Sequence, residues 1–184
     1  MALQAYAAFT LGGVELSGET TANSVGDVDV SHGHVEILEL NFGAERQGSN
    51  KKRAERHRLI PLRLVKRTDQ TTPLLYRGLS QGQILEGEIK LFDANPDSGE
   101  IRHRFSVSLG QAQIVSMTTT SPDVFDPEDA NRPVYDFLEI VAGSIAYADR
   151  VHGVEFEDHQ SSALRKKMAK LKTGKDKKKE KKAV

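Results

Sequence analysis

From Leu62 to Met117 the chain reads LRLVKRTDQTTPLLYRGLSQGQILEGEIKLFDANPDSGEIRHRFSVSLGQAQIVSM. Its first residues, 62–66, alternate between the two faces expected of a strand, because successive side chains of a strand point to opposite sides. Alternation returns over residues 85–91 and again from residue 101. Between those two runs, residues 95–99 (NPDSG) have the composition of a tight turn. We therefore predict a strand, a short helix, a strand, a turn and a long strand.

The helix is predicted between the first two of these strands. Thr71 or Thr72 can cap its start, Pro73 suits its first position, and Gly82 can end it. Three leucines spaced along it give one apolar side, which we expect to face the core. The residues on which this helix depends are Thr72, Pro73, Leu74, Leu75, Leu79 and Gly82.

The rest of the chain reads as strands joined by polar segments. Strands are expected over residues 3–11, 35–42, 57–65 and 134–147, with a short terminal strand within 151–156. Leu38 indicates a bulge or a change of face, Gly143 indicates a bulge, and Pro61 indicates an edge or a bulge because it lacks an amide hydrogen. About seven strands and one helix predict a mainly β domain, a closed or nearly closed barrel or a sandwich, over residues 1–160.

Charge is divided unevenly along the chain. The 184 residues hold 26 Lys and Arg and 26 Asp and Glu, a formal net charge of +0. Residues 165–184 contain 11 of these basic and 2 of these acidic residues, so this segment carries +9 and residues 1–164 carry −9. We expect residues 161–184 to be a disordered, Lys-rich tail outside the fold.

Several classes of protein are excluded or disfavoured by composition. The sequence has no cysteine, which excludes disulfides and thiol nucleophiles. Its N-terminus lacks the basic and apolar regions of a signal peptide. No run approaches the roughly 20 apolar residues of a membrane helix, so we expect no membrane insertion.

Candidate metal sites are incomplete. His32 and His34 share one face of an extended segment but lack a third ligand. Residues 93–99 imitate the start of a calcium loop, yet Ser98 stands where that loop needs Gly and Arg104 where it needs Glu. A proline-rich segment offers four carboxylates to a hard cation, at Asp123, Asp126, Glu128 and Asp129. We expect solvated histidines, a hairpin turn and a stiff connector here, and no cofactor.

Catalytic motifs are equally incomplete. Ser144 in AGSIA lacks the nucleophile-elbow pattern, and GLSQGQ at residues 78–83 has neither the Lys nor the spacing of a phosphate loop. We therefore expect no enzymatic activity.

Two interpretations of the tail stay open. A run of lysines can hold phosphates electrostatically, which would make the protein a nucleic-acid-binding module. The alternative is a solubilising extension, which the lack of aromatic residues favours, so we expect no nucleic-acid partner. Within the tail, SSALRKKMAKLK at residues 161–172 can form a weak amphipathic helix through Leu164, Met168 and Leu171 if it finds a partner.

Four segments together resemble the Hcp family, the hemolysin-coregulated tube proteins of bacterial type VI secretion systems. They are VEILELNFG at 35–43, LVKRTDQTTPLLYRGLSQGQ at 64–83, IVSM at 114–117 and YDFLEIVAGSIAYAD at 135–149. The second is similar to the family's strand, Asp and Ser/Thr-Pro-x-Leu helix ending in Gly. The chain departs from the family pattern in an enlarged Ile140–Gly143 segment, in Ala146-Tyr147 at the closing aromatic position, and in the Lys-rich tail.

The resemblance implies a closed barrel of two packed antiparallel sheets with one short flanking helix. It further implies a hexameric ring of identical subunits, stacked into a tube inside a contractile sheath and expelled with a spike protein. Small effector proteins would be carried in the lumen. The subunit would be made in the bacterial cytoplasm and then secreted through the apparatus without a signal peptide.

The resemblance also assigns a role to the polar loop at residues 44–56, as the arm that reaches an adjacent subunit or ring. The candidate interface residues in it are Arg46, Gln47, Ser49, Asn50, Lys51 and Lys52. An alternative within assemblies is a tail-tube protein of a phage or a phage-like contractile particle.

Overall fold

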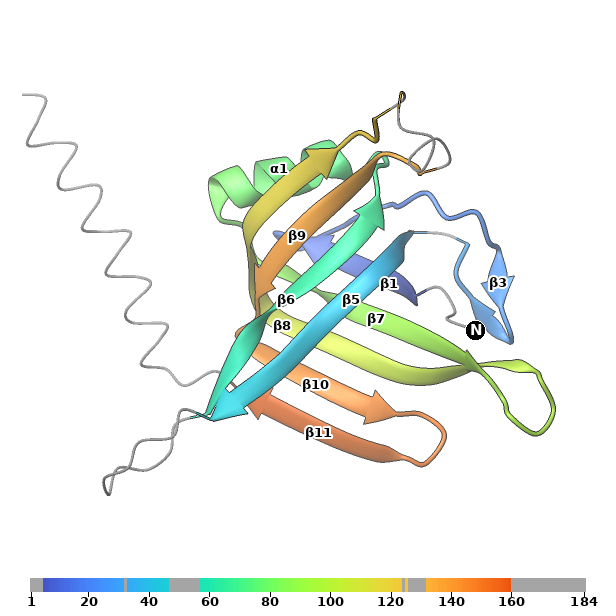
Figure 1. The fold of residues 1–184 in the computed structure, drawn as a ribbon. Coiled ribbons are helices and arrows are strands. Elements are labelled where there is room, and N and C mark those ends of the chain that lie inside the picture. Colours follow the sequence, from blue (N-terminus) through green and yellow to red (C-terminus); the bar gives the residue numbers. More distant parts are fainter. Residues whose placement is uncertain (1–4, 32, 47–56, 124, 126–131, 160–184) are drawn as a thin grey trace, which may run out of the picture.

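The fold is known from a computed structural model, which describes residues 5–31, 33–46, 57–123, 125 and 132–159 (Figure 1). The strands in this part of the chain are β1 Ala5–Leu11, β2 Val14–Glu15, β3 Ser24–Val25, β4 Val28–Asp29, β5 His34–Arg46, β6 His57–Arg67, β7 Leu85–Ala94, β8 Ile101–Thr120, β9 Tyr135–Val141, β10 Ser144–Asp149 and β11 Val154–His159. The helix α1, Thr72–Gln81, separates β6 from β7.

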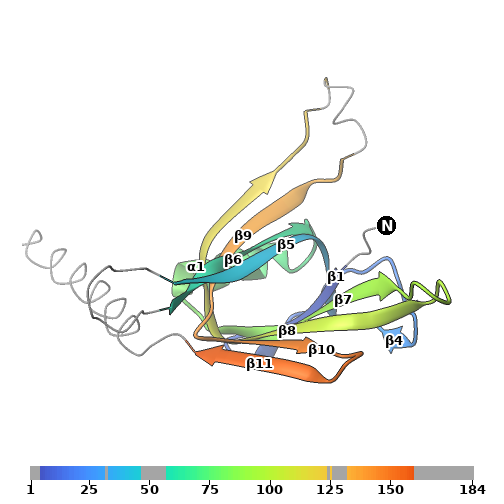
Figure 2. The ribbon, with the colours of Figure 1, turned by 60° about the horizontal axis from the view of Figure 1, so that its bottom comes forward.

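Nine of these strands form one antiparallel sheet whose pairings close into a ring. The ring runs β8-β7-β1-β5-β6-β9 and returns to β8, because β8 also pairs with β9. β10 and β11 extend the sheet from β8 outside the ring, β2 lies beside β1, and β3 and β4 form a separate pair. The predicted mainly β fold with one flanking helix is confirmed. Its two packed sheets are two sides of one continuous sheet, with β5, β6 and β9 crossing over β7 and β8 (Figures 1 and 2).

The long strand β8 connects the two sides. Along one edge, residues 101–112 pair with β7, and along the other edge β8 pairs first with β10 and then with β9. Between these two partners Gln111 adopts a φ of 48°, and the Gly143 amide donates to the Gly110 carbonyl at 3.0 Å. The single strand predicted over 134–147 is therefore wrong. Gly143 separates two strands instead of bulging from one, because β8 bends where its partner changes.

The other two irregularities agree with the sequence. The register of β5 shifts between Ile37 and Glu39, so the bulge predicted at Leu38 is confirmed. A second shift lies opposite Pro61, between Asn41 and Gly43, and pairing of β6 with β9 begins only after this proline. Both strands run farther than predicted, to Arg46 and Arg67.

The core fills the inside of the ring. Inward positions of the strands supply most of it, and Leu75 of α1 closes one side. Burial of a core leucine such as Leu75 stabilises the folded chain by about 1.5–3 kcal/mol relative to leaving its side chain exposed. A smaller cluster of Tyr6, Val30 and Phe92 packs beneath β3 and β4, with the Tyr6 and Phe92 rings edge to face at 6.0 Å.

The helix has the bounds expected from its sequence. Pro73 lies in its first turn, and Gly82 ends it in the left-handed conformation, with φ 61° and ψ 38°. The amide of Gln83 then donates to the Gly78 carbonyl at 2.9 Å, which satisfies one of the last carbonyls. Leu74 and Leu79 pack against the core from partly buried positions. Among the described residues no helix is long and apolar enough to cross a membrane.

Candidate assembly surfaces

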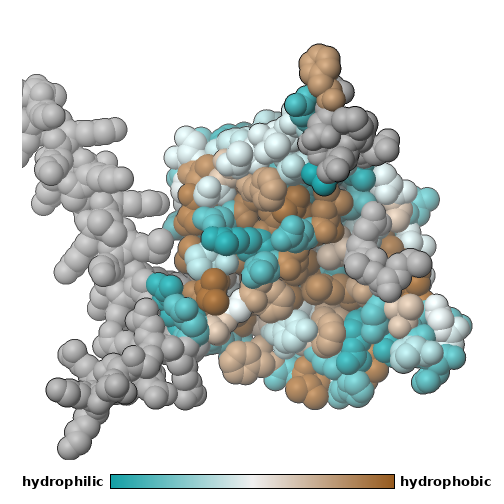
Figure 3. Space-filling model, viewed as in Figure 1, coloured by the Kyte–Doolittle hydropathy of each residue, from teal (hydrophilic) through white to brown (hydrophobic). Residues whose placement is uncertain are grey.

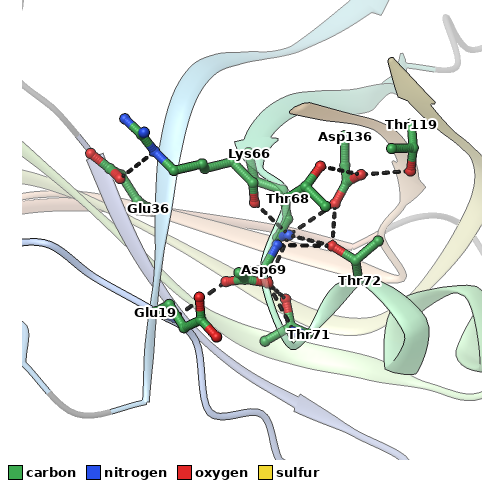
Figure 4. Close-up of polar contacts among 10 residues, drawn as sticks. Glu19, Glu36, Lys66, Thr68, Asp69, Thr71, Thr72, Thr119 and Asp136 are labelled. Carbon is green, nitrogen blue, oxygen red and sulfur yellow. Dashed lines mark hydrogen bonds and ion pairs between the residues drawn. The ribbon is translucent and has the colours of Figure 1, made fainter. Parts of the chain in front are cut away.

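Four elements meet around the buried side chain of Lys66 at the start of α1 (Figure 4). Lys66 lies on the inward face of β6, and its Nζ is 3.0 Å from Asp136 Oδ2 on β9 and 2.9 Å from Asp69 Oδ1. The same Nζ donates to Thr72 Oγ1 at 3.1 Å and to the Arg67 carbonyl at 2.7 Å. One ammonium group thus ties β6, β9 and the first residue of the helix together.

Asp136 is enclosed by donors from separate parts of the chain. Its Oδ1 accepts from Thr119 on β8 at 2.6 Å and from Thr68 at 3.1 Å, and its Oδ2 accepts from Thr72 at 2.5 Å. Burial by itself would raise the pKa of Asp136, but the hydrogen bonds from Thr119, Thr72 and Lys66 outweigh it and lower the pKa below its ordinary value. Asp136 is therefore a carboxylate, paired with the ammonium of Lys66.

Asp69 organises the approach to the helix. Its Oδ1 accepts from the Thr71 amide at 2.9 Å and from the Thr71 hydroxyl at 2.5 Å. Thr71 is the N-cap residue of α1, one of the two positions expected, but its side chain makes no capping hydrogen bond. The Thr71 hydroxyl is bound to Asp69, and the Thr72 hydroxyl donates to Asp136.

These groups are sealed inside the protein. The side chains of Lys66 and Asp136 are 1% and 0% exposed, and that of Asp69 is 4% exposed. A buried carboxylate on β5, Glu36, extends the network outward to Arg67, whose Nε lies 3.1 Å from it. No ligand can reach the central groups, so their effect is to fix α1 on the barrel. The surfaces open to partners lie elsewhere.

The first open surface is the outer face of β5, β6, β9 and the second half of β8 (Figure 3). Figure 3 shows hydrophobic residues on this face with hydrophilic residues among them. The exposed charged pair of Arg63 and Glu139 joins β6 to β9, with Nε and Oε1 2.8 Å apart. Phe137 is 45% exposed on this face, and the Tyr135 ring meets it edge to face at 5.2 Å. A hollow of about 350 Å³ opens here, lined by Glu39, Arg63, Leu64, Val65, Ser116, Thr118, Phe137, Leu138 and Glu139.

The second open surface belongs to β10 and β11, which we call the flange. In its register Val107, Tyr147 and Phe156 lie side by side on neighbouring strands, on the face that continues the core. Val107 is fully buried, whereas Phe156 is 63% exposed. The Tyr147 ring stacks on Phe105 at 5.2 Å and meets Phe42 at 5.5 Å. The apolar layer of the core therefore runs out to the surface on β11.

The flange also carries a shallow hollow and a fixed charge. The hollow has a volume of about 350 Å³ and is lined by Phe105, Tyr147, Asp149, His152, Val154, Glu155 and Phe156. A hydrogen bond with His152 Nδ1, at 2.8 Å, lowers the pKa of Asp149 to about 2, helped by the amides of His152 and Val151. Arg104 contacts the same carboxylate at 3.0 Å. The hollow is thus apolar, and the carboxylate at its rim is held by Arg104 and His152.

The third surface is the arm formed by the far ends of β5 and β6. Gly43–Arg46 of β5 pair with residues 57–60 of β6 alone, since β9 joins β6 only at Leu62. Arg46, the first predicted interface residue, ends β5. The other five lie outside the described residues: Gln47, Ser49, Asn50, Lys51 and Lys52. The structure thus places one of the six, at the root of the loop.

The candidate metal sites are not assembled in the described part of the chain, where no group of three or more His, Asp or Glu side chains is placed to hold an ion. His34 begins β5, with its Nε2 3.4 Å from Lys90 Nζ, and His32 lies outside the described residues. The hairpin turn predicted at residues 95–99 is confirmed, with the Gly99 amide donating to the Asn95 carbonyl at 2.7 Å. Asp93 is held by Arg102 at 2.8 Å. Of the acidic connector only Asp123 is described; Asp126, Glu128 and Asp129 are not.

Sequence reasoning missed the Lys66–Asp136 pair and the flange surface. A signal for the pair was present, because Lys66 alternates with Leu64 on one strand and Asp136 alternates with Leu138 on another. Their two strands pair so that Lys66 lies directly opposite Asp136. No local pattern indicated the flange, since its exposure depends on where the ring closes.

Comparisons with known proteins agree on one family. A family model described as "Type VI secretion system effector, Hcp" matches residues 10–149. A crystal structure of an Hcp protein superposes with a TM-score of 0.73 at 17% identity, covering 86% of this chain and 98% of that one. A variant of Hcp1 from the E. coli EAEC 042 pathovar gives 0.69 at 18% identity, covering 86% and 99%.

The secreted protein Hcp3 from Pseudomonas aeruginosa gives a TM-score of 0.62 at 18% identity, covering 86% of this chain and 98% of that one. At such identities the structural likeness establishes the fold. No curated protein matches the chain.

Proposed function

Because the chain belongs to the Hcp family of type VI secretion proteins, we propose that it is the structural subunit of the secretion tube. The single observation that carries this proposal is the family match, which extends over residues 10–149 and so includes the ring of strands except for residues 5–9 of β1. Hcp is a family of structural secreted proteins, not of enzymes. In this proposal six copies form a ring and rings stack into a tube. The tube is expelled with a spike from within a sheath and carries small effectors in its lumen.

The structure supports this proposal through its rigidity and its open surfaces. A tube subunit must keep its shape while it is pushed, and the closed ring with its buried ion pairs leaves few ways to deform. A head-to-tail contact joins two different surfaces of the subunit and closes into a ring when the rotation allows. The outer face around Phe137 and the arm formed by the far ends of β5 and β6 lie on different parts of the subunit and offer such a pair of surfaces.

Within this proposal, the arm at residues 44–56 reaches the neighbouring subunit or ring, through Arg46, Gln47, Ser49, Asn50, Lys51 and Lys52. The support is electrostatic, because these six residues include three basic and no acidic side chains, while residues 1–164 carry a net −9. Each such contact is weak, but repetition around a ring makes the assembly strong. In this proposal the subunit leaves the cytoplasm as part of the expelled tube, so it needs no signal peptide.

The test is the oligomeric state of the purified chain. Native mass spectrometry is expected to show a species of six chains, each of 20.3 kDa, and negative-stain microscopy is expected to show rings with a central hole. The variant Lys51→Glu is expected to weaken stacking between rings or contacts within them, while Arg77→Glu, an exposed residue of α1, is the matched charge-reversal control. A chain that stays monomeric at high concentration and low salt would contradict the proposal.

A further inference from the structure

The inner face of the flange ends in two large apolar side chains that the described part of the chain leaves uncovered. Val154 and Phe156 of β11 are each 63% exposed. In the register of the sheet, Val154 lies in line with Phe105, and Phe156 lies in line with Tyr147 and Val107. Val154 and Phe156 are therefore on the face of the sheet that buries Val107 and Leu109 on β8. Something that covers them would complete the apolar layer that the barrel begins.

The chain continues directly from this strand. β11 ends at His159, and only residue 160 separates it from the tail at residues 161–184. A strand of 6 residues is about 20 Å long, and a helix over residues 161–172 would be about 18 Å long. A helix that turns back after His159 would therefore span β11 once. Its apolar side, Leu164, Met168 and Leu171, has the spacing of one helix face.

Charge favours the same arrangement. β11 carries three acidic residues among its six, with Asp158 on the face of Val154 and Phe156 and Glu155 and Glu157 on the opposite face. Asp149 sits at the rim of the hollow, paired with Arg104 at 3.0 Å. Residues 161–172 carry one Arg and four Lys and no acid. A second copy would bring residues 1–164, with their net charge of −9, to this acidic edge. The tail carries the opposite charge, and because it is tethered to β11 its effective concentration there is high.

We propose that residues 161–172 fold back as an amphipathic helix on the inner face of the flange of the same chain, with Leu164, Met168 and Leu171 over Val154 and Phe156. The arrangement goes beyond the tube function, because it requires only one chain and holds whether or not rings form. It gives the Lys-rich tail a fixed root, with residues 173–184 extending from it.

The absence of native cysteine makes a direct test possible. Val154→Cys/Met168→Cys places one thiol on the proposed contact face. Glu157→Cys/Met168→Cys is the matched control, because Glu157 lies on the opposite face of β11 and nearer to the tail along the chain. Under mild oxidation of dilute protein, the first pair is expected to close within one chain about tenfold faster. An unattached tail gives the reverse order, since the shorter loop closes more readily.

Two outcomes of this experiment would overturn the proposal. One is equal or reversed rates for the two pairs. The other is a product linked between chains, which would show that a second copy covers the flange. Intact mass and non-reducing electrophoresis distinguish these products.

An independent test is hydrogen exchange, combined with a variant that removes the apolar side chain of Phe156 from the proposed contact. Amides of residues 161–172 in the full chain are expected to exchange with solvent at least about tenfold more slowly than those of residues 175–184. Phe156→Ser should abolish this difference, whereas Phe125→Ser, at a residue that is 91% exposed elsewhere, should leave it unchanged. Fast exchange in the unmodified chain, or protection that survives Phe156→Ser, would contradict the proposal.

Discussion

Lys66 shows how a charged side chain can occupy a core position. Taking an ammonium group out of water costs several kcal/mol, and the cost is offset only when the opposite charges and the remaining hydrogen bonds are well placed. Here two carboxylates lie within 3.0 Å of Nζ, and a hydroxyl and a carbonyl complete its surroundings. The Lys66–Asp136 pair adds little net stability, and its main effect is to fix the position of α1 on the barrel. It joins β6 and β9 to the first residue of α1.

Removing one member of this network should cost more than removing two. Lys66→Met leaves Asp136 buried without its cation, so we expect the free energy of unfolding to fall by about 3–5 kcal/mol. Lys66→Met/Asp136→Leu removes the two most deeply buried charges and leaves only Asp69 without its cation, so we expect it to regain part of that loss. Denaturant unfolding at one fixed protein concentration measures both values.

The control for this comparison is the exposed pair of Arg63 and Glu139 on the outer face. Arg63→Met should change the free energy of unfolding by only about 0–1 kcal/mol. A loss from Lys66→Met as small as that of Arg63→Met would show that the buried network does not hold the helix.

Acid should weaken the same network in a defined direction. The pKa of Asp136 is lower in the folded chain than its usual value, and the unfolded value is about 3.9. Its contribution is therefore complete above the unfolded pKa and is lost as the pH falls through the folded pKa. We expect Asp136→Asn to be less stable than the unmodified chain at pH 7, with the difference shrinking below about pH 4. Urea unfolding at pH 7, 5 and 3 measures it, and a difference that stays constant would contradict the assignment.

At this scale the sequence indicates which face a residue occupies but not what it meets. Alternation put Lys66 on the same side as Leu62 and Leu64, and that side is buried. Its partner Asp136 is 70 residues away in sequence. Only the pairing of β6 with β9 brings the two charges together, and this pairing depends on closure of the ring.

Among the elements, α1 is the one whose sequence determined it most completely. Pro73 and Gly82 mark its ends, and Leu75 is the side chain it buries in the core, at 1% exposure. Gly78 allows the helix to approach β1, since a Cβ there would lie 2.7 Å from Leu11. The hydrogen bonds at the start of the helix could not be predicted. The hydroxyls of Thr71 and Thr72, which could cap the helix, bind Asp69 and Asp136 instead.

Placing a charge at Leu75 should disrupt this packing. Leu75→Asp buries a carboxylate that has no partner, and we expect a loss of at least about 4 kcal/mol, enough to unfold the subunit or prevent its assembly. Arg77→Asp, on the exposed side of the same helix, is the control and should change stability by less than about 1 kcal/mol. Circular dichroism melting and native mass of both variants provide the measurement. Normal rings from Leu75→Asp would mean that the helix does not seal the barrel.

The strands show where prediction from sequence stops. Bulges at Leu38 and opposite Pro61 follow from local residue properties. The break at Gly143 does not follow from local residue properties. It lies where the same edge of β8 stops pairing with β10 and begins pairing with β9. This change of partner leaves the flange outside the ring and exposes Phe156. A periodicity of two residues indicates strands, but it carries no information about which strand each edge will meet.

For the whole molecule, the dominant physical feature is the separation of charge between body and tail. The neutral total conceals −9 on residues 1–164 and +9 on residues 165–184. In the proposed tube, stacking many copies of a body with one sign of charge requires compensation, and the basic arm and the basic tail are the segments that can supply it. That residues 161–184 form a tail separate from the fold stays a prediction from composition, because residues 160–184 lie outside the described residues.

Deleting residues 165–184 separates the tube function from nucleic-acid binding through the tail. If the tail serves nucleic acid, the full chain should bind DNA with an affinity that falls steeply with salt, and the deletion should abolish that binding. If the chain is a tube subunit, the deletion should leave ring mass and ring shape unchanged, because the ring of strands lies wholly within residues 5–141. Native mass and DNA binding at two salt concentrations, measured on both chains, decide the matter. Loss of rings on deletion would show that the tail belongs to the assembly itself, since the body alone would then lack a contact that closes it.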